Sequence, residues 1–301
     1  MWIAVVPAYN EANSIANVLR NLFACHCFHR LILVANGCTD STEETVLQVS
    51  ADTEEAKDLI EMLSFPEPLG IDVPRAVGAA FAQKKYQPAG IVFIDGDLAG
   101  QITAPILQLI HGLARGLDLA LTNCYPAMSG EHTMARRASP PFLADTVLKY
   151  RQILNDRLSL SKKIGQATPS HGPHAISARL LAEIPLQLLA IPPVALAYAA
   201  LHDFRIGVAA TIPHELLGSK FRNDEHAANI AATIIADCKQ ALSYLDGTPF
   251  PALLKACAQS TSGYQSFRRF DLLDTFLATL QAKNMISDPF NNRTGPNPLT
   301  G

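Results

Sequence analysis

Two carboxylates flank a glycine directly after an apolar run. Asp95 and Asp97 enclose Gly96, and the apolar residues 92–94 precede them. Mg²⁺ and Mn²⁺ prefer oxygen ligands, and carboxylates held at the end of a buried strand supply such ligands. An ordinary Asp-Gly turn contains the same residues. The segment therefore predicts a divalent-cation site, with a simple turn as the alternative.

Three other loops carry polar residues where apolar segments end or helices begin. Glu11, in AYNE, suits a ribose hydroxyl or a base N–H, and a helix-start acid is the structural alternative. Asp40, in NGCTD, suits either a ring imide N–H or the cap of the following helix. Arg75, in PRAVG, has a planar fork of donors that matches a pyrophosphate, with a surface arginine as the alternative. The four loops in this order are far more specific than any one of them.

The elements that must position these residues alternate between strand and helix patterns. We expect strands at 3–8, 31–35, 58–65, 90–95 and 117–123, and helices that begin near 15, 40, 75 and 104. The helix near 40 is predicted by the capping box DSTE, in which Asp40 accepts from the first turn and Glu43 reaches back. Such alternation predicts an α/β fold with a mostly parallel sheet. Ligands of open α/β sheets bind beyond the carboxyl ends of the strands, so we expect the four loops to meet there.

The pattern changes after residue 125. We expect a loop at 129–141, a long helix from 142, a turn-rich segment at 168–177, and helices at 225–245 and 267–283. The apolar faces of the last two helices predict a homodimer.

The composition indicates a large globular protein. Of its 301 residues 49% are hydrophobic and 17% are charged, which allows a sizeable core and excludes wholesale disorder. A net charge of -3 argues against a nucleic-acid partner held by a broad basic surface. Prolines interrupt the longest apolar stretch, 184–201, so we expect no transmembrane segment there.

The cysteines and the N-terminus indicate a cytoplasmic protein. The six cysteines are irregularly spaced and no signal-peptide pattern precedes them, so we expect reduced thiols. The segment CHCFH at 25–29 has metal-like residues, but no second ligand pair follows at finger spacing. We interpret it as the structural end of the first helix.

Together, the loops resemble the motifs of the family-2 nucleotide-sugar glycosyltransferases with the A-type fold. The matching segments are VVPAYNE at 5–11, VANGCTDST at 34–42, PRAVG at 74–78 and FIDGD at 93–97, the last as the Asp-x-Asp motif. The segment at 171–185 is similar to the start of the acceptor region in glucosyl-3-phosphoglycerate synthases and polyprenol-phosphate sugar transferases. The resemblance implies a mostly parallel sheet flanked by helices, a Rossmann-like nucleotide-binding half and a helical C-terminal part.

The resemblance also implies a division of the chain. Residues 1–125 would form the nucleotide-sugar-binding α/β domain and 126–218 the acceptor-binding region. The C-terminal helices would occupy 219–285, and 286–301 would be a flexible tail.

The resemblance assigns the donor site residue by residue. Glu11 and Asp40 would hold uridine or guanosine, Arg75 would lie near the phosphates, and Asp95 would reach the ribose or the metal. Asp97 would ligate Mg²⁺ or Mn²⁺, with His214 as a further ligand and His226 as its substitute. The remaining donor contacts that it implies are Pro7, Ala8, Tyr9, Asn36, Gly37 and Gly96.

The acceptor side departs from the family pattern. Members often have an acidic residue where the loop SHGPHA carries His171 and His174, and residues 188–202 contain no acid before Asp203. Either histidine suits a general base or an acceptor phosphate, and a retaining reaction needs no base at all. The stereochemical outcome therefore stays open.

Basic residues flank the same side of the predicted site. Arg136 and Arg137, with Lys162 and Lys163, would bind an anionic acceptor, and a solvated basic face is the alternative.

Three functions are compatible with these residues. The first is a metal-dependent glycosyltransferase that moves a sugar from a UDP- or GDP-sugar to a small, soluble, anionic acceptor, with a phosphoglycerate-like compound as the best guess. A nucleotidyltransferase is the second, although residues 5–11 lack the glycine and basic residue of a triphosphate loop. The third is a non-catalytic nucleotide-binding relative, motivated by the missing acid in 188–202.

Overall fold

One seven-stranded sheet organises the chain. The computed structural model describes residues 1–52, 54–126, 141–219 and 221–282. The strand order is β3-β2-β1-β4-β6-β5-β7, and β6 runs antiparallel to β4 and β5 whereas the other paired strands are parallel. The strands are β1 (Trp2–Ala8), β2 (Phe28–Asn36), β3 (Ile60–Phe65), β4 (Gly90–Phe93), β5 (Leu119–Asn123), β6 (His174–Ser177) and β7 (Ile206–Thr211). The mostly parallel α/β sheet predicted from the sequence is confirmed.

Helices cover both faces of the sheet, because both faces of each central strand are apolar. In β1, Ala4 and Val6 lie in the core shared with α1 (Ile15–Ala24), α2 (Thr42–Ala51) and α5 (Thr103–Ala114). Ile3 and Val5 face the opposite core, since successive strand residues point to opposite faces. That second core contains α4 (Val73–Tyr86) and α9 (Pro192–Leu201).

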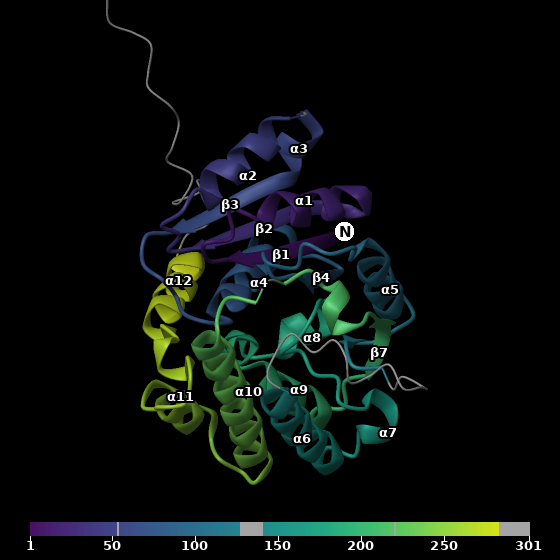
Figure 1. The fold of residues 1–301 in the computed structure, drawn as a ribbon, viewed down its shortest axis with the longest axis vertical. Coiled ribbons are helices and arrows are strands. Elements are labelled where there is room, and N and C mark those ends of the chain that lie inside the picture. Colours follow the sequence, from purple (N-terminus) through teal and green to yellow (C-terminus); the bar gives the residue numbers. More distant parts are fainter. Residues whose placement is uncertain (53, 127–140, 220, 283–301) are drawn as a thin grey trace, which may run out of the picture.

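The C-terminal helices pack against the second core, the one that contains α4 and α9. Figure 1 shows α6 (Pro141–Arg157), α10 (Asp224–Leu245) and α11 (Phe250–Ala258) gathered on one side of the molecule, with α12 (Phe270–Ala282) beside α4. The ring of Phe276 meets that of Phe65 edge-on at 5.8 Å. The apolar faces of α10 and α12 are thus covered within the chain, so they no longer argue for a homodimer, which stays a prediction.

Short helical segments complete the fold. They are α3 (Glu54–Leu59), α7 (Ser161–Ile164), α8 (Ala178–Glu183) and three 3₁₀ turns at Leu186–Ala190, His214–Leu216 and Gln265–Phe267. Within the described residues, no helix combines the length and the apolar character needed to cross a membrane.

The structure differs from the expected elements in four places. The strand expected at 58–65 begins at Ile60, because α3 occupies the residues before it. The turn-rich segment 168–177 contains β6, and α11 was not expected. Asp40 does cap the first turn of α2, but Glu43 accepts from Ser64 instead of reaching back, so only half of the expected capping box forms.

The sheet also continues past residue 125. Strands β6 and β7 lie on both sides of β5 and belong to the segment expected to form the acceptor region. The donor and acceptor halves therefore share one sheet, which fixes them relative to each other.

Candidate active site

A cavity of about 920 Å³ opens where β1 and β4 end. Residues of α4, α6 and α10 form its remaining walls. Most residues that the sequence nominated line it, from segments far apart in the chain. They are Pro7, Ala8, Tyr9, Glu11, Asn36, Arg75, Asp95, Gly96, Asp97, His171, His214 and His226.

A glycine is required where the loops after β1 and β4 meet. The Gly96 N–H donates to the carbonyl of Pro7 at 2.9 Å. A Cβ at Gly96 would lie 3.0 Å from that same carbonyl oxygen, closer than most side chains tolerate. The Asp-x-Asp segment is thus clamped onto the end of β1, and both its carboxylates are held at the rim of the cavity.

Asp97 is a partly buried carboxylate whose charge is poorly compensated. Burial raises the pKa of Asp97, and the charge of Asp95 raises it further. A hydrogen bond from Ser219 and the charge of Arg222 act in the opposite direction without cancelling the effect. A carboxylate in this condition gains most from a bound cation.

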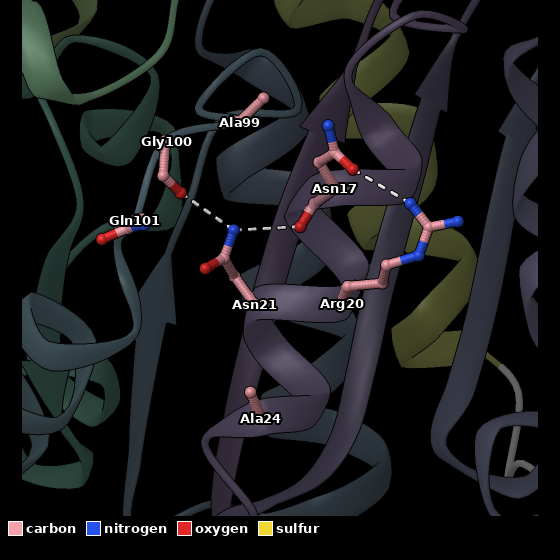
Figure 2. Close-up of a pocket in the computed structure, with 7 residues that line it drawn as sticks. All are labelled: Asn17, Arg20, Asn21, Ala24, Ala99, Gly100 and Gln101. Carbon is pink, nitrogen blue, oxygen red and sulfur yellow. Dashed lines mark hydrogen bonds between the residues drawn. The ribbon is translucent and has the colours of Figure 1, made fainter.

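The loop that follows Asp97 is held from two sides. On one side, the Gly100 N–H donates to the Leu217 carbonyl at 2.9 Å. On the other side is a shallow hollow of about 290 Å³ between this loop and α1, shown in Figure 2. There the Asn21 amide donates to the carbonyls of Gly100 at 2.9 Å and Asn17 at 3.0 Å. We interpret the hydrogen bonds of Asn21 as holding the loop that follows Asp97 in place.

Glu11 faces the same acidic rim. Burial raises its pKa, and Asp97 and Asp40 raise it further by charge repulsion. Arg222 forms an ion pair with Glu11 and opposes this shift, as does the hydrogen bond from Ser14 at 3.0 Å. The charges of Asp40 and Asp97 therefore both act on Glu11.

Arg75 is buried, and both of its terminal nitrogens contact acids. One of its terminal nitrogens contacts both oxygens of Asp95, at 2.7 and 2.8 Å, and the other contacts Asp72 at 2.6 Å. Burial lowers the pKa of Arg75, but these carboxylates more than offset that effect and raise it. Because both oxygens of Asp95 accept from Arg75, Asp95 is better placed to orient the site than to ligate a metal.

The ion pairs extend from Asp72 into the C-terminal helices. Arg268 contacts Asp72 at 3.0 Å and forms a two-pronged pair with Asp237 of α10 at 2.7 Å for each prong. The Arg268 side chain is fully buried, with 0% of its surface exposed. An unbroken chain of charges therefore runs from α10 to Asp95 at the end of β4.

Two histidines that line the cavity lie in direct contact. His171 Nε2 and His214 Nδ1 are 2.8 Å apart, and the ring of Tyr125 stacks on both. Burial lowers the pKa of His171 well below its usual value, and the positive charge of Arg151 lowers it further. The same two causes lower the pKa of His214, while Glu215 opposes them. Both imidazoles are therefore neutral near pH 7 and able to accept a proton.

The structure places His174 away from the cavity. It belongs to β6, stacks on Phe93 at 5.0 Å between ring centres, and is absent from the cavity lining. Burial lowers its pKa to about 3. The prediction of a catalytic or acceptor-binding role is wrong for His174, because alternation along β6 turns its side chain into the sheet core.

Two other nominated residues have structural roles. The Asp40 carboxylate accepts from Ala12 N at 3.1 Å and from Thr42 N at 3.0 Å, and it does not line the cavity. Gly37 has a φ of +66° and also lies outside the lining. Arg136 and Arg137 fall outside the described residues.

The residues present fit a divalent cation that is shared with a diphosphate. In the described part of the chain, no three His, Cys, Asp or Glu side chains come close enough to hold a metal by themselves. His214 bonds to His171, so its role as a metal ligand stays a prediction. Asp97 remains as one partly buried carboxylate with a raised pKa, and Mg²⁺ and Mn²⁺ often combine one or two carboxylates with phosphate oxygens and water.

Three residues of the site were missed at first. Arg222 pairs with Glu11, Arg151 lines the cavity, and Asp72 links Arg75 to Arg268. Only Arg151 had a signal in the sequence. It lies four residues after Val147 on a helix, so a charged side chain falls on the same helix face as an apolar one.

The raised pKa of Asp97 leads to a first prediction about stability. A group whose pKa is raised on folding opposes folding when it is ionised, and this effect disappears as the pH falls below its ordinary range. Without metal, Asp97→Asn should raise the melting temperature at pH 7 by about 2 °C, the shift expected for about 1 kcal/mol in a large domain. The gain should vanish near pH 4, the ordinary value for aspartate. A thermal scan at both pH values checks this, and a lower melting temperature at pH 7 would contradict it.

The sheet and the site together define the class of protein. An acidic rim beyond parallel strands, with a poorly compensated carboxylate and a buried arginine beside it, is the arrangement of a nucleotide-sugar glycosyltransferase of the A-type fold. The chain belongs to glycosyl transferase family 2, whose family model matches residues 3–179.

Solved structures show the same fold at low sequence identity. Glucosyl-3-phosphoglycerate synthase from Mycobacterium tuberculosis, in complex with Mn²⁺, UDP and glucosyl-3-phosphoglycerate, is 19% identical with a TM-score of 0.52, over 79% of this chain and 80% of that one. A mannosyltransferase from Pyrobaculum calidifontis, in complex with GDP-Man and Mn²⁺, is 17% identical with a TM-score of 0.55, over 94% and 86%. No curated protein sequence matches the chain.

Proposed function

We propose that the protein transfers a sugar from a UDP- or GDP-sugar to a small anionic acceptor, with Mg²⁺ or Mn²⁺ bound at the donor site. The observation that carries this proposal is the half-buried Asp97 carboxylate at the rim of a large cavity. Its pKa is raised by burial and by Asp95, so a bound cation would stabilise its charged form. The complexes of the two structural neighbours with Mn²⁺ and either UDP or GDP-Man support it. A phosphoglycerate-like acceptor is the best guess within this class.

In this proposal the donor lies across the acidic rim. Glu11 binds the nucleoside, Asp95 is held by Arg75 in position for the ribose, and Asp97 ligates the metal. Asp97 would hold the Mg²⁺ or Mn²⁺, whose positive charge would offset the charge that develops on the leaving diphosphate. Arg222 adds a positive charge that is not buried, opposite Glu11.

The acceptor hydroxyl would meet the donor near His171. This imidazole is neutral, lines the cavity and contacts His214, so it is suited to accept the hydroxyl proton in an inverting reaction. A cytosolic location completes the proposal, since all six cysteines are free thiols.

Calorimetry with nucleoside diphosphates tests the donor site directly. We expect UDP or GDP to bind at least about 10-fold more tightly with Mn²⁺ present, because a cation held by Asp97 would attract the negatively charged diphosphate. The corresponding monophosphate serves as the control and should show little metal dependence. Failure of both diphosphates to bind would overturn the proposal, and release of pyrophosphate from a nucleoside triphosphate would replace it with nucleotidyl transfer. Donor binding without hydrolysis or transfer to any anionic acceptor would favour a non-catalytic relative.

A further inference from the structure

Arg151 is a buried arginine without an acidic partner. Only 2% of its surface is exposed, yet the described residues offer it neither an ion pair nor a hydrogen bond, and its Nε is buried without an acceptor. The other two buried arginines of the described chain are paired with acids, although the Nε of Arg75 also lacks an acceptor. Arg75 and Arg268 each contact two carboxylates. Burying an unpaired charge is costly, so a buried arginine that has no acid among the described residues indicates a partner from outside that part of the chain.

Arg151 lies on α6 and lines the cavity, where α6 packs against α10. It stands four residues after Val147 on α6, and both residues line the cavity. Ile230 and Ile234 of α10 contribute apolar side chains to the same cavity. An apolar surrounding strengthens any charge–charge attraction there, because little water screens it.

A second unsatisfied polar group belongs to the same cavity. The hydroxyl of Ser170 is buried without a hydrogen-bond partner, and Ser170 lines the cavity next to His171. Two unpaired polar groups, one of them a five-donor cation, thus line one cavity beside the predicted base.

We propose that Arg151, with the Ser170 hydroxyl, binds an oxyanion of the acceptor, either a carboxylate or a phosphate. This inference rests on the proposed function, because it assigns the acceptor end of the same cavity. The guanidinium fork matches the planar oxygen pair of a carboxylate and two oxygens of a phosphate. His171 lines the same cavity, and the charges of both Arg151 and Arg75 act on its ring. An acceptor anchored on Arg151 would therefore be held in the cavity that also contains His171 and the donor-side residues.

The test compares Arg151→Met with Arg157→Met. Both residues lie on α6, but Arg157 is exposed and pairs with Asp246, so its replacement changes the net charge equally without touching the cavity. The probes are 3-phosphoglycerate, glycerol 3-phosphate and glycerate, titrated by calorimetry in the presence of UDP or GDP with Mn²⁺. The last two probes separate phosphate from carboxylate recognition.

We expect Arg151→Met to weaken binding of the recognised anion by about 10- to 100-fold, the usual range for a hydrogen bond to a charged group. Nucleotide affinity should stay unchanged, and Arg157→Met should bind all probes as the unmodified protein does. The melting temperature of Arg151→Met should be no lower than that of Arg157→Met, because the replacement removes an unpaired buried charge. A purely structural arginine would give the opposite result.

Several outcomes would overturn the inference separately from the proposed function. If the unmodified protein binds UDP or GDP with Mn²⁺ but none of the three anions, the donor site stands and the anion site does not. Equal anion binding by Arg151→Met and the unmodified protein would also overturn the anion site. Loss of nucleotide binding in Arg151→Met would overturn the assignment of Arg151 to the acceptor alone. Marked destabilisation of Arg151→Met would show that the arginine serves the fold.

Discussion

Asparagine in place of Asp97 should abolish sugar transfer almost completely, with a fall in rate of about 1000-fold or more. A metal that stabilises the leaving diphosphate contributes several kcal/mol, and each 1.4 kcal/mol corresponds to about a factor of ten. Asparagine keeps the size of the side chain but loses the negative charge that draws the cation. The measurement is single-turnover transfer or donor hydrolysis over a range of Mn²⁺ concentrations.

The matched control for this prediction is Asp203→Asn. Asp203 is an exposed acid with a φ of +56°, a conformation that asparagine also tolerates, so its replacement should leave the rate unchanged. If Asp97→Asn retains metal-dependent transfer at the rate of Asp203→Asn, then the metal is not held by Asp97. The stability gain expected for Asp97→Asn at pH 7 would show that lost activity does not come from unfolding.

Arg268→Met should cause the largest loss of stability, about 3–5 kcal/mol in the free energy of unfolding. Breaking a buried ion pair from one side leaves its partners uncompensated, and here both Asp237 and Asp72 would remain. The loss of Arg268 would also free Asp72 to reorient. Its ion pair with Arg75, which in turn holds Asp95, would then be weakened. Urea denaturation measures the stability, and nucleotide titration measures the effect on the donor site.

The neighbouring Arg269 provides the control for Arg268. Its ion pairs with Glu67 and Asp271 lie at the surface, where such pairs contribute at most about 1 kcal/mol. Arg269→Met should therefore change stability little. Adding Asp237→Asn to Arg268→Met should restore part of the loss, since it removes one uncompensated charge. Equal effects of Arg268→Met and Arg269→Met would show that the buried charge chain is not structurally important.

The sequence predicted the donor site through a simple geometric rule. Glu11 and Asp97 each follow a strand pattern, and the carboxyl ends of neighbouring parallel strands meet at one edge. The positions of Glu11 and Asp97 at the ends of predicted strands were therefore enough to predict that the two side chains lie at the same edge of the sheet. Asp40 shows the limit of the rule, because its oxygens are taken by local backbone donors at a helix start.

The acceptor end depended on contacts between distant segments. His171 and His214 are separated by 43 residues but lie 2.8 Å apart, and nothing in their separate motifs indicated a shared contact. His174 was nominated beside His171, yet His174 begins β6 and is buried, whereas His171 precedes the strand and lines the cavity. A short strand of four residues leaves too weak a pattern to reveal which way each side chain points.

The sequence by itself determined the family, the sheet and the acidic rim, because these follow from local periodicity and from residues at strand ends. Only the tertiary structure decided which charges are paired. Arg75 and Arg268 meet acids from other segments, whereas Arg151 meets none among the described residues. The electrostatic state of a buried group depends on every element packed around it, and that packing exists only after distant parts of the chain have come together.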